Sequence, residues 1–127
     1  HIGDSRVYLW RNGMLTPLTD DHSLVQELVR LGQVTEEEAK THPQRHVLVR
    51  ALGVDPVIEI DRKMVDVSKG DVFLLCTDGF SSVLDNEEIS REFRAQASWE
   101  ARLENLKQLV FERGAPDNFT VLCCVVE

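Results

Sequence analysis

Three aspartates of this 127-residue chain stand where a polar loop meets an apolar, strand-like segment. Asp4 precedes such a segment, Asp78 follows the apolar run Val72–Cys76 after one intervening threonine, and Asp117 precedes the valine-rich end of the chain. If these segments are neighbouring strands of one sheet, the three carboxylates converge at one edge. Carboxylate oxygens suit Mg²⁺ and Mn²⁺, which keep several waters and need few protein ligands. The three aspartates are therefore candidates for a divalent metal site.

Asp78 and Arg50 each have a structural interpretation beside the functional one. Asp78 precedes Gly79, and Asp-Gly is a common turn dipeptide, so this stretch alone fits a turn as well as a metal ligand. Arg50 lies among the apolar residues of Val47–Leu52. A buried arginine needs an anionic partner, which is either a carboxylate of the chain or the phosphate of a ligand. For Arg50 we favour the carboxylate.

The Gly-Asp-Ser-Arg sequence around Asp4 leaves three interpretations open: a metal ligand, a Ser5 nucleophile, or a turn held by Asp4 and Arg6. A serine nucleophile needs a general base to activate its hydroxyl. Hydrolases of the Gly-Asp-Ser type are expected to carry an Asp-x-x-His pair near the C-terminus, whereas the last histidine here is His46. The four histidines show no spacing typical of metal ligands, and we interpret them as polar contacts: His1, His22, His42 and His46.

The strands that would position these residues have clear local signals. Asn12-Gly13 between Val7–Trp10 and Met14–Leu18 predicts a β-hairpin. The run Val72–Cys76 is too short for a typical helix and predicts a buried strand. Phe119–Val126 predicts the closing strand. Further strands are predicted over Val47–Leu52 and Val57–Val67.

Helical signals fill the remainder of the chain. A helix is predicted from Ser23 to Gly32, and a second begins at the capping box of Thr35 and Glu38. These two helices form an excursion between β segments that could act as a mobile flap. Two more helices are predicted from Asp85 to about Ala97 and from Ser98 to Gly114.

Composition narrows the classes of function. The net charge is −8 with no compensating basic block, which argues against binding to nucleic acid or to anionic membranes. Cys76, Cys123 and Cys124 show no Cys-x-x-Cys or zinc spacing, which favours reduced cysteines in a core. No apolar stretch approaches the roughly 20 residues that cross a bilayer, and no leader opens the chain. We therefore expect one cytoplasmic domain, or most of one, that combines helices and strands.

Five motifs occur in a fixed order along nearly the whole chain. They are GDSRVYL at 3–9, LTDDHS at 18–23, HP followed by VLVRALG across 42–53, GDVFLLCTDGF at 70–80 and APDNFTVL at 115–122. Together they closely resemble the metal-dependent protein serine/threonine phosphatases of the type 2C class, in particular their bacterial members. The ordered set is far more specific than any one motif alone.

The resemblance implies an α+β fold in which two antiparallel sheets form a sandwich flanked by helices, with a binuclear Mg²⁺ or Mn²⁺ centre at one end. It implies that Asp78 and Asp117 are ligands of that centre and that Asp4 helps to hold an additional, more weakly bound metal. Residues 20–50 correspond to the flap, and Arg50 matches a motif position without a catalytic role. The implied reaction is hydrolysis of phosphoproteins by metal-activated water.

The chain departs from the family pattern in one respect. The family's phosphate-holding arginine and its metal-bridging Asp-Gly-x-Gly-Gly motif have no counterpart here, so no catalytic side chain is assigned. We therefore expect residues 1–127 to be the C-terminal portion of a single phosphatase domain that is inactive alone. Unpaired sheet edges would favour dimerisation or association with the missing N-terminal half. The alternative is a non-catalytic structural or interaction half-domain.

Overall fold

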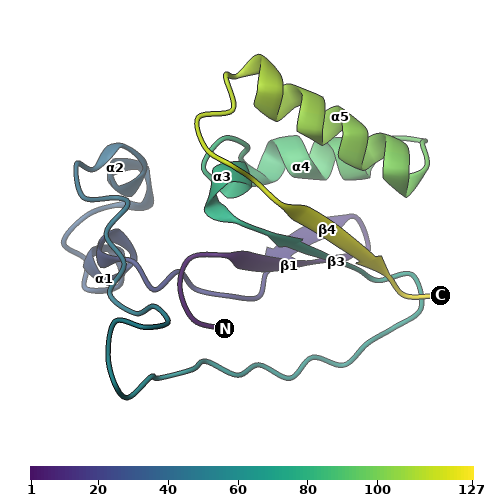
Figure 1. Cartoon of the computed structure of the whole chain (residues 1–127). Helices are drawn as coiled ribbons and strands as arrows, with labels where there is room; N and C mark the ends of the chain where they lie inside the picture. Colours follow the sequence, from purple (N-terminus) through teal and green to yellow (C-terminus); the bar gives the residue numbers. More distant parts are fainter. The chain divides into compact units, whose positions relative to one another are not determined.

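The computed structural model describes all 127 residues, which divide into two compact units. The first unit comprises His1–Ser5 and Thr19–Met64, and the second comprises Arg6–Leu18 and Val65–Glu127. Each unit is built around its own helices, which are labelled in Figure 1. None of these helices has both the length and the apolar character needed to cross a membrane.

The second unit contains a four-stranded antiparallel sheet in the order β2-β1-β3-β4. Its strands are β1 (Arg6–Arg11), β2 (Met14–Pro17), β3 (Val72–Cys76) and β4 (Val121–Val125). The predicted hairpin is confirmed, because Asn12 and Gly13 have φ angles of 52° and 76° and join β1 to β2. Positive φ at both loop residues gives the turn whose twist matches that of paired strands. The predicted strand Val72–Cys76 is β3.

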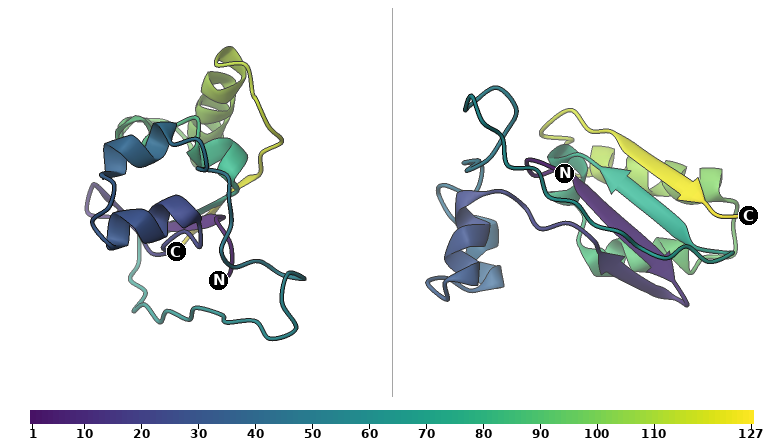
Figure 2. Two further views of the ribbon diagram at one scale, coloured as in Figure 1. Left: turned by 90° about the vertical axis from the view of Figure 1, so that its left-hand side faces the viewer. Right: turned by 90° about the horizontal axis from the view of Figure 1, so that it is seen from below.

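Three helices cover one face of this sheet, as Figures 1 and 2 show. They are α3 (Asp78–Ser81), α4 (Asn86–Phe93) and α5 (Trp99–Glu112). Alternate strand residues such as Tyr8 and Leu74 point to this face and pack with Phe80, Phe93 and Leu106. Each of these side chains is at most 2% exposed, and burying one contributes about 1.5–3 kcal/mol. The core of the second unit lies between this face and the helices.

The opposite face of the sheet carries apolar side chains that no helix of the second unit covers. Val7, Leu75 and Leu122 are register partners across β1, β3 and β4, so they form one row on this face. Leu75 is 37% exposed and Leu122 is 54% exposed. The second sheet expected for a sandwich is not formed by this chain.

An ion pair between the buried Asp71 and the partly exposed Arg11 fixes the entry to β3. Asp71 is 2% exposed, and its carboxylate accepts hydrogen bonds from Arg11 Nε at 2.8 Å and Arg11 Nη2 at 2.6 Å. The backbone N–H of Ser68 also donates to Asp71, at 2.7 Å. These donors, the Arg11 guanidinium first, lower the pKa of Asp71 to about 2. The carboxylate therefore stays charged where β1 and β3 meet.

The first unit contains the two predicted flap helices, α1 (Leu24–Arg30) and α2 (Glu36–Thr41). The Ser23 hydroxyl caps α1 by accepting the Gln26 N–H, and Thr35 and Glu38 form the complete capping box of α2. Each cap satisfies N–H groups that the first helical turn leaves unpaired. The sequence signals for both helices are confirmed.

Two predicted strands were wrong. Val47–Leu52 is not a strand, and it forms a single isolated bridge between Leu48 and Ser23. Val57–Val67 is also not a strand, and nearly all of its residues are exposed, Val57 by 85% and Met64 by 99%. A strand needs a neighbour that takes up its N–H and C=O groups, and this chain supplies none for these two segments.

Smaller differences concern the ends of elements in the second unit. Helix α4 ends at Phe93 rather than near Ala97, and β4 begins at Val121 rather than Phe119. The single turn α3 was not predicted, because Asp78-Gly79 was interpreted as a turn or a metal site. The combination of an antiparallel sheet with helices is confirmed.

Candidate functional site

The end of β3 is hydrogen-bonded to the loop that leads into β4. Thr77 occupies the N-cap position of α3, yet its hydroxyl makes no capping bond. It accepts instead from the backbone N–H of Thr120 at 3.0 Å, and the Thr77 N–H donates to the Thr120 carbonyl at 3.1 Å. Asp78 therefore begins its helix beside the loop that contains Asp117.

Gly79 brings the two backbones into direct contact. A Cβ atom at this position would overlap the carbonyl oxygen of Asn118 and would lie 2.9 Å from its carbonyl carbon. It would also lie 3.2 Å from the Cβ of Phe119. Only glycine fits this approach. The structure thus places the Asp78-Gly79 and Asp117-Asn118 segments side by side in the second unit.

The donor chemistry of these segments fits a hard divalent cation. Asp78 is partly buried and Asp117 is exposed, and Asp117 Oδ1 accepts the Asn118 N–H at 2.7 Å. Two carboxylates provide the oxygen ligands that Mg²⁺ and Mn²⁺ prefer, with the remaining positions filled by water or by further ligands. Asp4 lies in the first unit. The convergence of all three aspartates stays a prediction.

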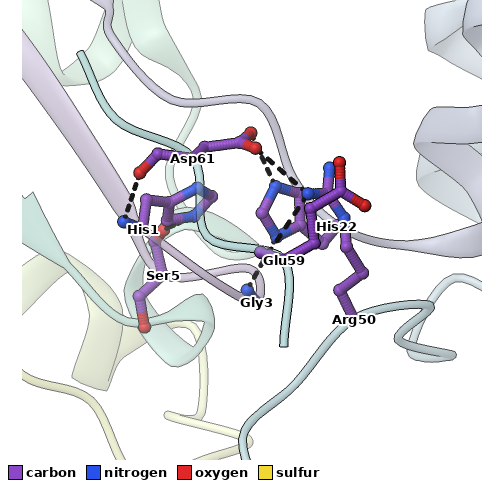
Figure 3. Close-up of polar contacts among 7 residues, drawn as sticks. All are labelled: His1, Gly3, Ser5, His22, Arg50, Glu59 and Asp61. Carbon is purple, nitrogen blue, oxygen red and sulfur yellow. Dashed lines mark hydrogen bonds and ion pairs between the residues drawn. The ribbon is translucent and has the colours of Figure 1, made fainter. Parts of the chain in front are cut away.

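The loop that carries Asp4 is held by His22. Gly3 has a φ of 103°, a left-handed conformation that favours glycine. The backbone N–H of Gly3 donates to His22 Nδ1 at 3.1 Å, and the backbone N–H of His22 donates to the Gly3 carbonyl at 2.8 Å. The side-chain contact is visible in Figure 3. His22 is only 2% exposed, so the polar contact predicted for it is a buried one.

Asp61 connects His22 with Arg50. Its carboxylate accepts from His22 Nε2 at 2.8 Å and from Arg50 Nη1 at 3.0 Å. The hydrogen bonds of these two donors, His22 first, lower the pKa of Asp61. The carboxylate partner predicted for Arg50 is therefore confirmed and is Asp61. The sequence analysis missed Asp61, because it lies in a segment that we interpreted only as a strand.

His1, His22 and Asp61 bring three potential ligand atoms within 4.8 Å of one another. Because His22 Nδ1 accepts the Gly3 N–H, its Nε2 carries the proton and donates it to Asp61. A histidine that binds a metal through one nitrogen normally donates a hydrogen bond through the other. His22 has the opposite arrangement. This group is therefore a hydrogen-bonded connection between segments and not a metal centre.

A cavity of about 600 Å³ in the first unit is lined largely by carboxylates, including Asp20, Asp21 and Glu59. Arg50 also lines it and is paired with Asp61. A phosphate would be repelled by these carboxylates, so the alternative role of Arg50 as a phosphate ligand finds no support. Ser5 likewise finds no base, because His1 Nε2 contacts the Ser5 carbonyl, at 2.9 Å, rather than its hydroxyl.

Comparison with known proteins identifies related phosphatases. The chain is 37% identical over 122 residues to the serine/threonine phosphatase stp of Listeria monocytogenes, covering 96% of this chain and 48% of that protein. It is 42% identical to the serine/threonine protein phosphatase PstP of Mycobacterium tuberculosis, covering 96% of this chain and 23% of PstP. No family model matches the chain. The chain thus spans about half the length of the Listeria phosphatase and about a quarter of the length of PstP.

Solved structures show the same relation in three dimensions. A serine/threonine phosphatase of S. agalactiae superimposes with a TM-score of 0.93 at 37% identity, covering 100% of this chain and 52% of that one. The M. tuberculosis phosphatase PstP/Ppp gives a TM-score of 0.89 at 41% identity and covers 100% and 54%. A further structure, of the PstP catalytic domain in complex with two manganese ions, gives 0.85 at 37% identity and covers 100% and 52%. Over its whole length the chain is therefore similar to PPM-type serine/threonine protein phosphatases, and it spans about half of the phosphatase chains with which it superimposes.

Proposed function

We propose that this chain is the C-terminal half of a metal-dependent phosphatase domain that hydrolyses phosphoserine and phosphothreonine in proteins. The observation that carries the proposal is the contact between the Asp78-Gly79 and Asp117-Asn118 segments. This contact brings together two carboxylate segments in a chain whose relatives are named serine/threonine phosphatases. We place the domain in the cytoplasm, where its three free cysteines would stay reduced.

Asp78 and Asp117 hold Mn²⁺ or Mg²⁺ in this proposal, and Asp4 contributes to an additional ion. One neighbouring structure, the PstP catalytic domain, is described in complex with two manganese ions. Such an ion lowers the pKa of a bound water and offsets the negative charge of a phosphate. The role of the chain is to supply carboxylate ligands on segments that Gly79 and Thr77 hold together.

The chain alone is expected to be inactive. It lacks a counterpart of the family's phosphate-holding arginine and of its metal-bridging Asp-Gly-x-Gly-Gly motif. We therefore propose that a second half of similar length completes the site. We call this chain joined to such a second half the completed domain. The second half is the N-terminal portion that the protein's own gene encodes or, if the gene encodes none, the corresponding portion of PstP.

The test is turnover of a phosphothreonine peptide by the completed domain. We expect turnover to require Mn²⁺ or Mg²⁺ and to fall at least a hundredfold in Asp78→Ala and in Asp117→Ala, because each change removes a metal ligand. Exposed Glu100→Ala serves as the matched control and should retain full turnover. Unchanged turnover in both aspartate variants would contradict the proposal. Robust turnover by the 127-residue chain alone would contradict its dependence on a second half.

A further inference from the structure

His22 connects three segments of the first unit. Its ring accepts the Gly3 N–H through Nδ1 and donates to Asp61 through Nε2. Its own carbonyl accepts the Val49 N–H at 2.8 Å. The side chain is 2% exposed, so water does not compete for these bonds. Figure 3 shows the ring between Gly3 and Asp61.

The two ring contacts have different roles. Asp61 is an acceptor and holds the proton on Nε2, which leaves the Nδ1 lone pair for Gly3. The Gly3 N–H and C=O are both bonded to His22, so the peptide units on either side of the Gly3 Cα, the second of which leads into Asp4, are both held by His22. Asp61 therefore sets the tautomer, and His22 sets the backbone from which the Asp4 side chain departs.

We propose that His22 is a positioning residue that orients Asp4 for its metal ion, with Asp61 selecting the tautomer that this requires. The inference rests on the proposed role of Asp4 as a metal ligand. Residues that orient metal ligands through a hydrogen bond typically change metal affinity by about 10–100-fold when they are replaced. His22 acts through the backbone next to Asp4, so we expect a loss of about tenfold, at the lower end of that range.

Two substitutions separate the two ring contacts. In His22→Asn the amide oxygen lies the same number of bonds from Cβ as Nδ1, so it can accept the Gly3 N–H while the Asp61 contact is lost. In His22→Gln the amide nitrogen reaches the position of Nε2, so the Asp61 contact is kept and the Gly3 bond is lost. The proposal predicts that asparagine preserves metal binding and glutamine does not.

The measurement is a Mn²⁺ titration of the completed domain followed by electron paramagnetic resonance, with turnover recorded at each Mn²⁺ concentration. Asp4→Asn should remove the weakest binding component. His22→Gln should weaken that component about tenfold, with turnover recovering at high Mn²⁺. His22→Asn should stay within about threefold of the unmodified domain. His46→Gln, at an exposed histidine of the same unit, is the matched control and should change nothing.

The outcomes distinguish this inference from the proposed function. A purely structural role would make both His22 variants lower turnover equally at every Mn²⁺ concentration, and that result would overturn the inference. An unchanged titration in His22→Gln would overturn it as well. If Asp78→Asn abolishes turnover while Asp4→Asn leaves the titration unaltered, the proposed phosphatase activity stands, whereas the metal role of Asp4 and the inference that rests on it fail. If Asp78→Asn also leaves turnover unchanged, the proposed function fails, and the inference fails with it.

Discussion

At the scale of single residues, the contacts of Gly79 and Thr77 hold together the two segments that carry Asp78 and Asp117. From the sequence we predicted that Asp78 and Asp117 are candidate metal ligands, because each carboxylate lies at the end of an apolar, strand-like segment. The sequence did not predict that Gly79 touches Asn118 or that the Thr77 hydroxyl binds Thr120. Such contacts join residues about 40 positions apart, and no local pattern reports them.

Gly79 provides the sharpest test at this scale. In an ordinary helix, replacing glycine by alanine stabilises by roughly 0.5–1 kcal/mol. Here the added methyl group overlaps the Asn118 carbonyl, so we expect Gly79→Ala to lower the free energy of unfolding by about 1–3 kcal/mol. It should also weaken Mn²⁺ binding, because it separates the segments of Asp78 and Asp117. Denaturant unfolding and a Mn²⁺ titration of the completed domain measure both effects.

The matched control is Ser82→Ala, at an exposed position at the end of the same helix. It should leave the free energy of unfolding within about 0.5 kcal/mol of the unmodified value. A stabilised Gly79→Ala variant would show that helix propensity outweighs the contact with Asn118, and the close approach would then lose its significance for the site.

At the scale of secondary structure, the sequence predicted the elements whose signals are local. The capping boxes at Thr35 and Asp85 and the Asn12-Gly13 turn lie within a few residues of the structure they specify, and each was confirmed. Val47–Leu52 and Val57–Val67 have suitable residues for strands but no partner in this chain. For the same reason Asp61 was missed, since its importance comes from His22, 39 positions away.

One side chain links two helices and gives a pH prediction. Glu88 closes the capping box of α4 and also binds Arg113 at the end of α5. These bonds, that of Arg113 first, lower the pKa of Glu88 from 4.5 to about 2. A carboxyl group whose pKa is lower in the folded state than in the unfolded state stabilises the fold at pH values above its unfolded pKa. This contribution is therefore complete above pH 4.5 and disappears as the pH falls through about 2.

We expect Glu88→Gln to reduce the loss of stability that the completed domain shows between pH 4.5 and pH 2. The free energy of unfolding, measured by denaturant titration at several pH values, should differ most from that of the unmodified domain above pH 4.5 and converge with it near pH 2. Exposed Glu100→Gln should follow the unmodified curve throughout. A constant difference across the pH range would contradict an ionic role for Glu88.

At the scale of the molecule, the helices of the second unit cover only one face of its sheet. Tyr8 and Leu74 are buried under the helices, whereas Leu75 and Leu122 remain exposed on the other face. The relatives from Listeria and S. agalactiae are about twice as long as this chain. An apolar sheet face is costly in water, so the proposed second half has an energetic reason to cover it.

This argument predicts that Leu122→Lys has opposite consequences in two settings. In the 127-residue chain the substitution places a charge on an exposed apolar face, so self-association measured by sedimentation should decrease. In the completed domain the same lysine would be buried without a partner, so the free energy of unfolding should fall by about 2–5 kcal/mol. Leu31→Lys, at a leucine that is 60% exposed outside the sheet, should alter neither property. If the completed domain tolerates Leu122→Lys as well as Leu31→Lys, the second half does not cover this face, and the energetic reason proposed for its association is lost.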